Sequence, residues 1–508
     1  MKKIFITGAS GSMGSQVLAK VTELDVKILL LMQKSKKNMK LAKKLDKQYP
    51  FRIEVKFGDI VNYEDCVYCI ENSDIIVHCA ALIPPKADYN PELAYKVNFN
   101  GTKNLTDALN ASKNKDTKYY IVIGTVAIYG NRDYKHAWGR VGDPLLPSAY
   151  DYYAMSKLRA ERYVLDNPAP HFTVLRQTGI LHDNLLKNNF EDGLIFHNPY
   201  NTPIEWVTAY DSGVCIKNLC EKIINDTLPS SFWNNIYNIG GGESCRVTCY
   251  ETYDAGFAIM HAHAKQVFMP QWCATRNFHC MWFYDSDKLE EYLHFRTQSF
   301  TDYWKHMNKI NFIIKLGVLL SKYFIKTYIV GKVLRSRNAP AHWRKTGQYN
   351  RIDAAFGSVD KYDNMPTDWK DFPLLCEGET PNGKIDYKNL KDITKVCENN
   401  LLLSHGYDES KSDDSLDIKD MQSAASFRGG KCLSTSMKTG DLWTPLKWSC
   451  HSGHEFMASP FTILKAGHWC PDCCQPAPWN YDELAKHIPF FAQVWYDTHE
   501  KNENKIYK

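Results

Sequence analysis

The stretch KIFITGASGSMGSQVLAK, residues 3–20, joins a short apolar strand to a helix through a turn that holds three glycines. Glycine allows a tight turn and lets the backbone approach a phosphate closely. The helix that follows offers unpaired N–H groups and the positive end of its dipole. The stretch therefore predicts a turn that binds the pyrophosphate of a dinucleotide, with contacts from Gly8, Ser10, Gly11, Ser12, Met13 and Gly14.

The alternation of strand and helix continues beyond this turn, as in a parallel sheet whose crossover connections are helices. The strands expected first are Lys3–Thr7, Lys27–Met32, Arg52–Phe57, Ile75–Cys79 and Tyr119–Ile123. Those expected further on are Phe172–Leu175, Glu205–Val207 and Tyr237–Ile239, before a short helix at Leu289–Leu293. We therefore predict an α/β fold, a Rossmann-type doubly wound parallel sheet with a small α/β substrate portion.

Tyr153 precedes Lys157 by four residues in a stretch of helix-forming sequence. This spacing places the phenol and the ammonium on one face of a helix, one turn apart. Because a nearby cation favours the phenolate, Tyr153 is expected to exchange a proton near neutral pH. The pair predicts an acid/base couple that acts on a hydroxyl or a carbonyl.

The glycine turn and the Y-x-x-x-K pair, about 140 residues apart, resemble the extended short-chain dehydrogenase/reductase family, also called the NAD-dependent epimerase/dehydratase family. The resemblance covers residues 1–305 and rests on three further matches. Gly58-Asp59-Ile60 matches the position where the Asp meets the adenine amino group. His78-Cys79-Ala80-Ala81 matches the strand end that passes the cofactor ribose, so Ala80 and Ala81 are expected there. Asn98-Phe99-Asn100-Gly101-Thr102 matches N-x-x-G-T, in which the Asn stabilises the central sheet.

The resemblance also implies the chemistry. Thr125 falls where the family has its catalytic Ser or Thr, Tyr153 moves the proton, and Lys157 reaches the nicotinamide ribose. Members that dehydrate nucleotide sugars carry Asp-Glu after this position, whereas this chain has Val126-Ala127, which disfavours dehydration. An oxidoreductase that acts on a carbonyl or an alcohol is therefore expected. A nucleotide-sugar epimerase and a non-catalytic, cofactor-bound redox sensor or binding protein are the alternatives.

The end of the second strand bears on the choice of cofactor. Members that prefer NAD carry a carboxylate there for the adenosine 2′-hydroxyl, but residues 31–37 read LMQKSKK. Lys34 and its basic neighbours suit a 2′-phosphate instead. The sequence thus favours NADP, with NAD as the alternative.

The carboxyl-terminal part of the chain holds closely spaced cysteines with the W-x-C-x-x-G-H and W-C-P-x-C signatures of small zinc-ribbon domains. Such spacing is typical of structural zinc sites. The expected ligands are Cys450, Cys470, Cys473 and, as the fourth, Cys432, with His454 as the alternative fourth ligand; Cys474 is expected to point away. A nucleic-acid or protein contact through this zinc module, or a structural role, is left open.

The 508 residues are too many for one ordinary domain. We expect an extended short-chain dehydrogenase/reductase domain at 1–305, a helical and irregular extension at 306–384, and a carboxyl-terminal domain at 385–508 with its zinc module at about 429–475. Within these, 338–384 is expected to be irregular, Tyr387–Leu402 helical and Ser410–Ser415 a loop. The apolar, lysine-bearing stretch 312–334 is expected to pack on the enzyme, with a peripheral membrane contact as the alternative.

Composition sets the remaining expectations. A net charge of +5 does not demand nucleic acid, and 16 scattered cysteines fit reduced thiols in a cytoplasmic protein. The expected substrate is a small-molecule carbonyl or alcohol, or a sugar, and a homodimer is left open.

Overall fold

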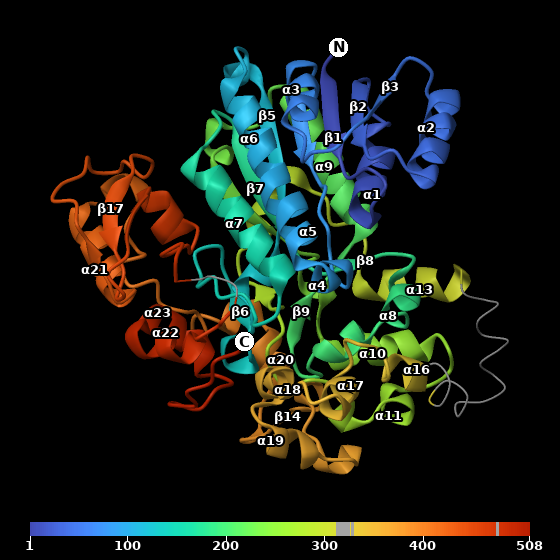
Figure 1. The fold of residues 1–508 in the computed structure, drawn as a ribbon, viewed down its shortest axis with the longest axis vertical. Coiled ribbons are helices and arrows are strands. Elements are labelled where there is room, and N and C mark those ends of the chain that lie inside the picture. Colours follow the sequence, from blue (N-terminus) through green and yellow to red (C-terminus); the bar gives the residue numbers. More distant parts are fainter. Residues whose placement is uncertain (311–325, 327–329, 474–476) are drawn as a thin grey trace.

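The computed structural model describes residues 1–310, 326, 330–473 and 477–508, and its largest element is a seven-stranded parallel sheet (Figure 1). The strand order is β11-β7-β5-β4-β1-β2-β3. The strands are β1 Lys3–Thr7, β2 Lys27–Met32, β3 Ile53–Phe57, β4 Ile75–His78, β5 Tyr119–Thr125, β7 Phe172–Gln177 and β11 Asn235–Ile239. This arrangement confirms the predicted Rossmann-type fold.

Helices cover both faces of the sheet, because successive strand residues point to opposite sides. Phe5 packs toward one core, and its neighbours Ile4 and Ile6 pack toward the other. Helices α3 (Tyr63–Glu71), α6 (Gly101–Ala111) and α7 (Tyr152–Asp166) cover the first face. Helices α1 (Ser12–Val21), α2 (Lys36–Gln48), α9 (Ala209–Ile224) and α12 (Asp287–Leu293) cover the second.

The substrate portion consists of short strand pairs and helices beyond the carboxyl ends of the sheet strands. The pairs are β8 (Ile180–Leu181) with β10 (Val207–Thr208), β9 (Pro203–Glu205) with β12 (Arg246–Thr248), and β6 (Trp138–Gly139) with β13 (Trp282–Phe283). The expected strand Glu205–Val207 is therefore wrong as one element, since the chain changes partner strand at Trp206. The buried carboxylate of Glu205 binds Arg246, which holds the end of β9 in place.

The expectation of irregular chain at 338–384 is wrong for its first half, which forms the short helices α17 (Pro340–Lys345), α18 (Tyr349–Phe356) and α19 (Val359–Asp363), whereas the rest has only three-residue helical turns and the two-residue strands β14 (Glu379–Thr380) and β15 (Gly383–Lys384). Pro340 begins α17, Ser358 caps α19 through the N–H of Lys361, and Gly357 ends α18 at φ 95°. The expected helix at Tyr387–Leu402 is too long: α20 (Tyr387–Lys391) ends at Asp392.

Most of the stretch 312–334, which was expected to pack on the enzyme, lies outside the described residues; Lys326 and residues 330–334, with α16 (Gly331–Val333), are described. In the part of the chain that the structure describes, every helix is too short or too polar to cross a membrane.

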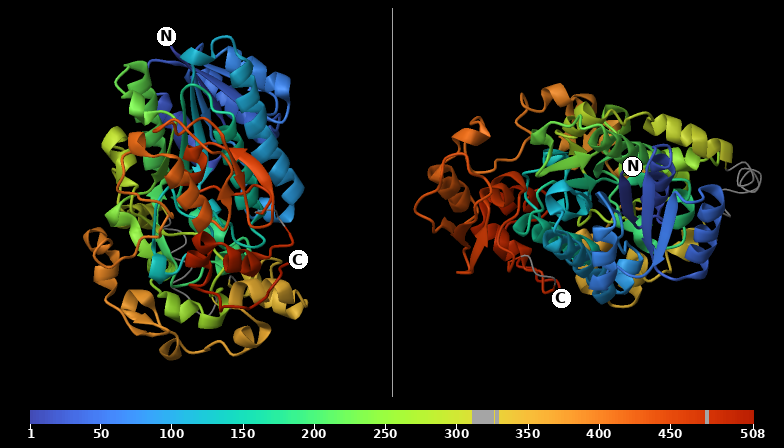
Figure 2. Two further views of the ribbon diagram at one scale, coloured as in Figure 1. Left: turned by 90° about the vertical axis from the view of Figure 1, so that its left-hand side faces the viewer. Right: turned by 90° about the horizontal axis from the view of Figure 1, so that it is seen from above.

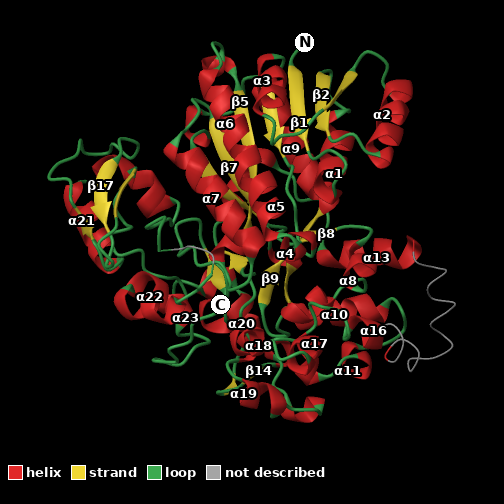
Figure 3. Ribbon diagram, in the orientation of Figure 1, coloured by secondary structure: helices red, strands yellow, loops and turns green. Residues whose placement is uncertain are grey.

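The carboxyl-terminal module contains a three-stranded antiparallel sheet of β16 (Lys431–Cys432), β17 (Leu446–Ser449) and β18 (Glu455–Ala458), with helix α21 (Ile418–Phe427) beside it (Figure 3). The module lies against the α7 side of the large sheet in every view (Figures 1 and 2). Trp443 joins the two parts, because its ring contacts Phe172 of β7 at a centroid distance of 5.7 Å and stacks on Phe461. The apolar core of the module is thus continuous with that of the first sheet face.

Candidate functional site

The glycine turn has the geometry of a phosphate cradle. Gly8 has φ 72°, and a Cβ there would lie 2.7 Å from the nitrogen of Ala80. A Cβ on Gly14 would lie 2.2 Å from the carbonyl oxygen of Gly8, so β1, β4 and α1 meet closely here. Gly11 is the N-cap of α1 and provides no side-chain cap. The amino end of α1 therefore keeps the N–H groups and the space that a pyrophosphate requires.

Asn98 holds the loop after β4. Its Oδ1 accepts the N–H of Leu82 at 2.7 Å, and its Nδ2 donates to the carbonyl of Leu82 and to Ser156 Oγ. These bonds tie the loop that contains Ala80 and Ala81 to helix α7. Asn98 thus acts on the backbone, as the family resemblance implies.

Two of the cofactor candidates, Ile60 and Met13, have buried apolar side chains. Ile60 lies in the core against Gly101, where an added Cβ would meet its Cδ1 at 2.5 Å. Met13 is buried on α1. Neither side chain is polar, so any cofactor contact from these two residues comes from the backbone or from apolar surface.

The predicted adenosine end lies between β2 and α2. The side chain of Gln33 donates to Asp59 Oδ2 at 2.8 Å. Lys37 donates to the carbonyl of Ser10 at 3.1 Å, and Lys34 is exposed beside it in the chain. One basic side chain, that of Lys37, therefore lies against the glycine turn.

The three predicted catalytic residues meet at the carboxyl end of β5. Thr125 is its last residue, and its hydroxyl accepts the N–H of Ala127. Tyr153 forms a side-chain hydrogen bond with Thr125, and Lys157 donates to the carbonyl of Ile123 at 2.8 Å. Helix α7, whose N-cap Asp151 accepts the N–H of Ala154, presents both residues to the strand end.

Burial dominates the electrostatics of this group. It raises the pKa of Tyr153 to about 12, although the hydrogen bond with Thr125 acts in the opposite direction. It lowers the pKa of Lys157 to about 8, against the attraction of Glu161 and Cys79. The pKa of the phenol thus lies above the neutral range that the sequence argument assigned. The reason is that loss of water around the phenolate outweighs any effect of the lysine on its pKa.

Replacing Lys157 by methionine is expected to stabilise the protein at pH 7. A pKa of about 8 instead of 10.5 costs about 3 kcal/mol of folding free energy at pH values below 8, and this cost disappears as the pH rises to 10.5. The variant loses the hydrogen bond from Lys157 to the carbonyl of Ile123, which costs it about 1 kcal/mol. A net increase of about 2 kcal/mol in the free energy of unfolding is therefore expected at pH 7. Urea unfolding of both proteins at pH 7 and pH 10 measures this gain. The burial argument is contradicted if the variant is less stable than the unmodified protein at pH 7. It is also contradicted if the stability gain of the variant is as large at pH 10 as at pH 7.

A cavity of about 240 Å³ adjoins Tyr153. Its walls come from the loop before α7, from the substrate portion and from the extension. Residues within 82–90, 177–206 and 240–300 contribute to the lining. Trp343 and Arg351 also line it, although they belong to no sequence motif. The lining residues are Pro84, Asp88, Ser148, Ala149, Tyr150, Asp151, Tyr153, Leu194, His197, Ala274, Arg276, Asn277, Phe278, His279, Trp343, Arg351 and Ala355.

A second cavity, of about 370 Å³, adjoins the amino end of α1. Ser12, Ser15 and Gln16 form one wall, and Tyr210 of α9 lies among the other lining residues. The cavity therefore connects the glycine turn and the amino end of α1 with the substrate portion. No sequence motif marks the far wall, which includes His182, Asp183, Asn184, Gln298, Tyr303 and His306.

The carboxyl-terminal module gathers Cys450, His454, Cys470 and Cys473, whose ligand atoms all lie within 4.8 Å of one another. The turn between β17 and β18 supplies the first two. Cys432, the fourth ligand preferred from the sequence, is not in this group, and its thiol lies near the carbonyl of Ser434 instead. The structure thus brings His454, and not Cys432, together with the three cysteines. Cys474 lies outside the described residues.

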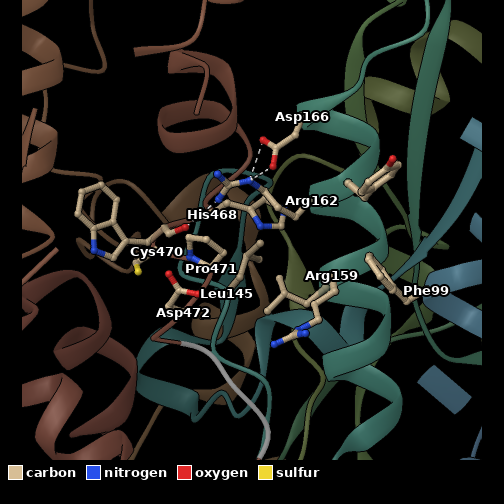
Figure 4. A pocket seen from close by; sticks show the side chains of 12 residues that line it. Phe99, Leu145, Arg159, Arg162, Asp166, His468, Cys470, Pro471 and Asp472 are labelled. Carbon is tan, nitrogen blue, oxygen red and sulfur yellow. Dashed lines mark hydrogen bonds and ion pairs between the residues drawn. The ribbon is translucent and has the colours of Figure 1, made fainter. Parts of the chain in front are cut away.

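The module contacts the catalytic helix through polar bonds. Arg162 of α7 donates to the carbonyls of Trp469 and Met457, at 2.8 and 3.1 Å. Glu161 pairs with Arg176 of β7 and bonds to His468 at 3.0 Å. A cavity of about 270 Å³ lies along this contact, between α7 and the segment that carries Cys470 (Figure 4).

Residues 4–176 match the model of the NAD dependent epimerase/dehydratase family. The sterol-4-alpha-carboxylate 3-dehydrogenase, decarboxylating, of Homo sapiens is 30% identical over 133 residues, which are 25% of this chain and 34% of that protein. The UDP-glucose 4-epimerase of Rickettsia canadensis is 29% identical over 136 residues, 25% of this chain and 38% of that protein. The matched region thus spans about a third of the length of these curated relatives.

Two solved structures are similar over a longer region. The dTDP-glucose 4,6-dehydratase of Streptomyces venezuelae, with NAD bound, is 18% identical with a TM-score of 0.48, and the match covers 61% of this chain and 96% of that one. The UDP-Glc/GlcNAc 4-epimerase of Campylobacter jejuni is 19% identical with a TM-score of 0.46, and the match covers 62% and 100%.

Proposed function

With residues 4–176 matching the NAD dependent epimerase/dehydratase family, we propose that this protein is an NAD(P)-dependent oxidoreductase that acts on a carbonyl or alcohol carbon. One observation carries the proposal: Thr125, Tyr153 and Lys157 converge at the carboxyl end of β5, beside a cavity and on the same edge of the parallel sheet as the glycine turn that follows β1. Polar groups at the carboxyl ends of parallel strands occupy the usual ligand edge of such a fold.

The residues divide the chemistry among them. A bound nicotinamide would supply or accept the hydride. In reduction, Tyr153 donates its phenolic proton to the substrate's carbonyl oxygen, and in oxidation it removes the proton from the hydroxyl. Thr125 hydrogen-bonds to the same oxygen, since its hydroxyl already contacts that of Tyr153. Lys157 provides a fixed positive charge from the next turn of α7.

Epimerisation is the second candidate, because UDP-glucose 4-epimerases are among the curated relatives of the same part of the chain. The two candidates differ in their demand for cofactor. A reductase consumes added NADPH or NADH in proportion to product, whereas an epimerase forms product without net consumption. Turnover assays with carbonyl compounds and nucleotide sugars, together with identification of any co-purified nucleotide, test both. Absence of turnover on every compound would favour the redox-sensor alternative.

We further propose NADP as the preferred cofactor, with Lys34 and Lys37 beside its 2′-phosphate. Lys37 already contacts the carbonyl of Ser10 in the glycine turn. The unmodified protein is expected to bind NADPH about tenfold more tightly than NADH, or better, and the double variant Lys34→Glu/Lys37→Glu is expected to reverse that order. Lys44→Glu, an exposed charge further along α2, is the control and should leave the ratio unchanged. Fluorescence titration measures the four affinities, and a clear NADH preference of the unmodified protein would contradict the assignment.

For the cysteine cluster we propose a structural zinc ion. Tetrahedral zinc with bonds of about 2.3 Å to sulfur and about 2.0–2.1 Å to nitrogen separates two sulfurs by about 3.8 Å, and a sulfur from a nitrogen by about 3.6 Å. The distance from Cys473 Sγ to Cys450 Sγ is 3.7 Å, and His454 Nδ1 lies 3.5 and 3.6 Å from the sulfurs of Cys470 and Cys473. The residues present therefore fit the ion. A homodimer, and a nucleic-acid or protein contact of the module, stay predictions.

A further inference from the structure

Arg351 of α18 brings a positive charge to the cavity beside Tyr153. Its guanidinium carbon lies 4.5 Å from the ring centroid of Tyr150 and 5.6 Å from that of Trp343. Two aromatic rings thus pack against the planar group. Tyr150 itself has φ 68°, a left-handed backbone that is rare for a residue with a side chain.

Within the described part of the chain, the guanidinium of Arg351 has no anionic partner. Among residues 1–310, 326, 330–473 and 477–508, no carboxylate lies within ion-pair distance of it and no acceptor bonds to it. Arg276, in the same cavity wall, is by contrast fully engaged: it pairs with Glu503 at 2.7 and 2.9 Å and donates to the carbonyl of Thr498. The positive charge of Arg351 is therefore available to a ligand.

The acidic residues of the cavity do not neutralise this charge. Burial and the nearby Asp151 raise the pKa of Asp88 to about 8, so its carboxyl is mostly protonated at pH 7. Asp151 is itself engaged, since it caps α7 and contacts His279 Nδ1 at 3.1 Å. Neither acidic residue of the cavity wall therefore forms an ion pair with Arg351.

We propose that Arg351 binds an anionic group, a carboxylate or a phosphate, on the substrate whose reactive carbon lies at Tyr153. The proposal rests on the proposed function for the role of Tyr153. The planar fork of an arginine side chain can bond such a group through two parallel N–H donors. The volume of about 240 Å³ is smaller than that of the usual drug-sized site and suits a small acid. Because Arg351 belongs to the extension, this segment would set substrate choice for the catalytic residues of the Rossmann-type domain.

Calorimetric titration of the full-length protein with malonate and, separately, with inorganic phosphate tests the proposal without any turnover. The unmodified protein is expected to bind at least one of them with a millimolar dissociation constant, and Arg351→Gln is expected to weaken that binding at least tenfold. Binding of malonate alone identifies a carboxylate site, and binding of phosphate alone identifies a phosphate site. Equal binding by Arg351→Gln, or no binding to the unmodified protein at about 20 mM of either anion, would overturn the proposal.

Two further variants test whether weaker anion binding by Arg351→Gln is due to the lost guanidinium contact. The other causes to be excluded are unfolding of the protein and its changed net charge. Arg351→Lys retains the charge and the stem but not the planar fork, so it should bind several-fold more weakly than the unmodified protein while unfolding at the same temperature. Arg344→Gln removes an arginine that is paired with Asp363 outside the cavity, and should bind as the unmodified protein does. If Arg344→Gln weakens binding as much as Arg351→Gln, general charge attraction explains the effect and the site is not at Arg351.

Tyr153→Phe separates this proposal from the proposed function. It should retain malonate or phosphate binding, because its hydroxyl is not needed to hold the anion. If no substrate is ever turned over, the oxidoreductase proposal fails while the titration still decides the role of Arg351. If turnover depends on Tyr153 and the titration shows no role for Arg351, only the substrate assignment fails.

Discussion

Replacing Tyr153 by phenylalanine is expected to lower kcat by about 10²–10⁴-fold and to leave the affinity for NADPH or NADH within a factor of about two. The change removes one oxygen, whose hydrogen-bond partner in the structure is Thr125. The glycine turn at Gly8 and Gly14 lies elsewhere on β1 and α1, so cofactor binding should persist. The lower kcat would then result from the loss of proton transfer and not from weaker cofactor binding.

Tyr152→Phe is the matched control for this substitution. Tyr152 is the neighbour of Tyr153 on α7, and its ring lies 5.5 Å from that of Trp479, on the side of the carboxyl-terminal module. It has no lysine four residues further on. The control should therefore keep normal turnover. Near-normal turnover by Tyr153→Phe, or equal losses in the two variants, would remove Tyr153 from the proposed mechanism.

The sheet and its ligand edge were predictable because their causes are local. Apolar runs such as Lys27–Met32 are buried on both sides and end at polar or glycine positions, and this pattern matches the strands of the structure. Thr125, Tyr153 and Lys157 could be chosen as candidates from the sequence, since two are related by helical spacing and the third stands at the end of a strand. Their hydrogen bonds confirm that they come together, but spacing alone could not give the pKa of a phenol that folding buries.

The residues that sequence reasoning missed depend on contacts between distant segments. Arg351 reaches the cavity because α17 and α18 of the extension form part of its wall, and such short helices give a weak periodic signal. His454 and Cys432 were both candidates for the fourth ligand position. The choice depends on the hairpin between β17 and β18, in which Gly453 has φ 80° and the N–H of Cys450 bonds to the carbonyl of His454. That turn brings His454 beside Cys450, and no count of intervening residues shows it.

Purified protein is expected to contain one zinc ion per chain, and Cys450→Ser or Cys470→Ser is expected to lose it together with the fold of the module. Structural zinc contributes about 10–16 kcal/mol of apparent binding free energy at pH 7 in small zinc domains, so its loss exceeds the stability of most domains. Elemental analysis gives the metal content, and near-ultraviolet circular dichroism reports the packing of Trp448 and Trp469, which are buried in the module.

Paired variants decide the identity of the fourth ligand. His454→Ala is expected to reduce zinc affinity at least tenfold, whereas Cys432→Ser should retain one zinc ion with unchanged affinity, because Cys432 is not in the cluster. The reverse result would restore the assignment made from the sequence. Full stability of the unmodified protein after complete removal of metal would show that the module folds without an ion.

Loss of zinc should also reduce catalytic activity, although the cluster is not part of the active site. Cys470 follows directly after Trp469, whose carbonyl accepts a hydrogen bond from Arg162 of α7. When the module unfolds, the buried side chain of Arg162 loses its carbonyl acceptors, and Glu161 loses His468. Glu161 lies one helical turn beyond Lys157 and raises the pKa of that lysine. Metal removal should therefore lower kcat as well as thermal stability, and zinc should restore both together. Unchanged kcat in metal-free protein would mean that α7 holds its catalytic residues without the module.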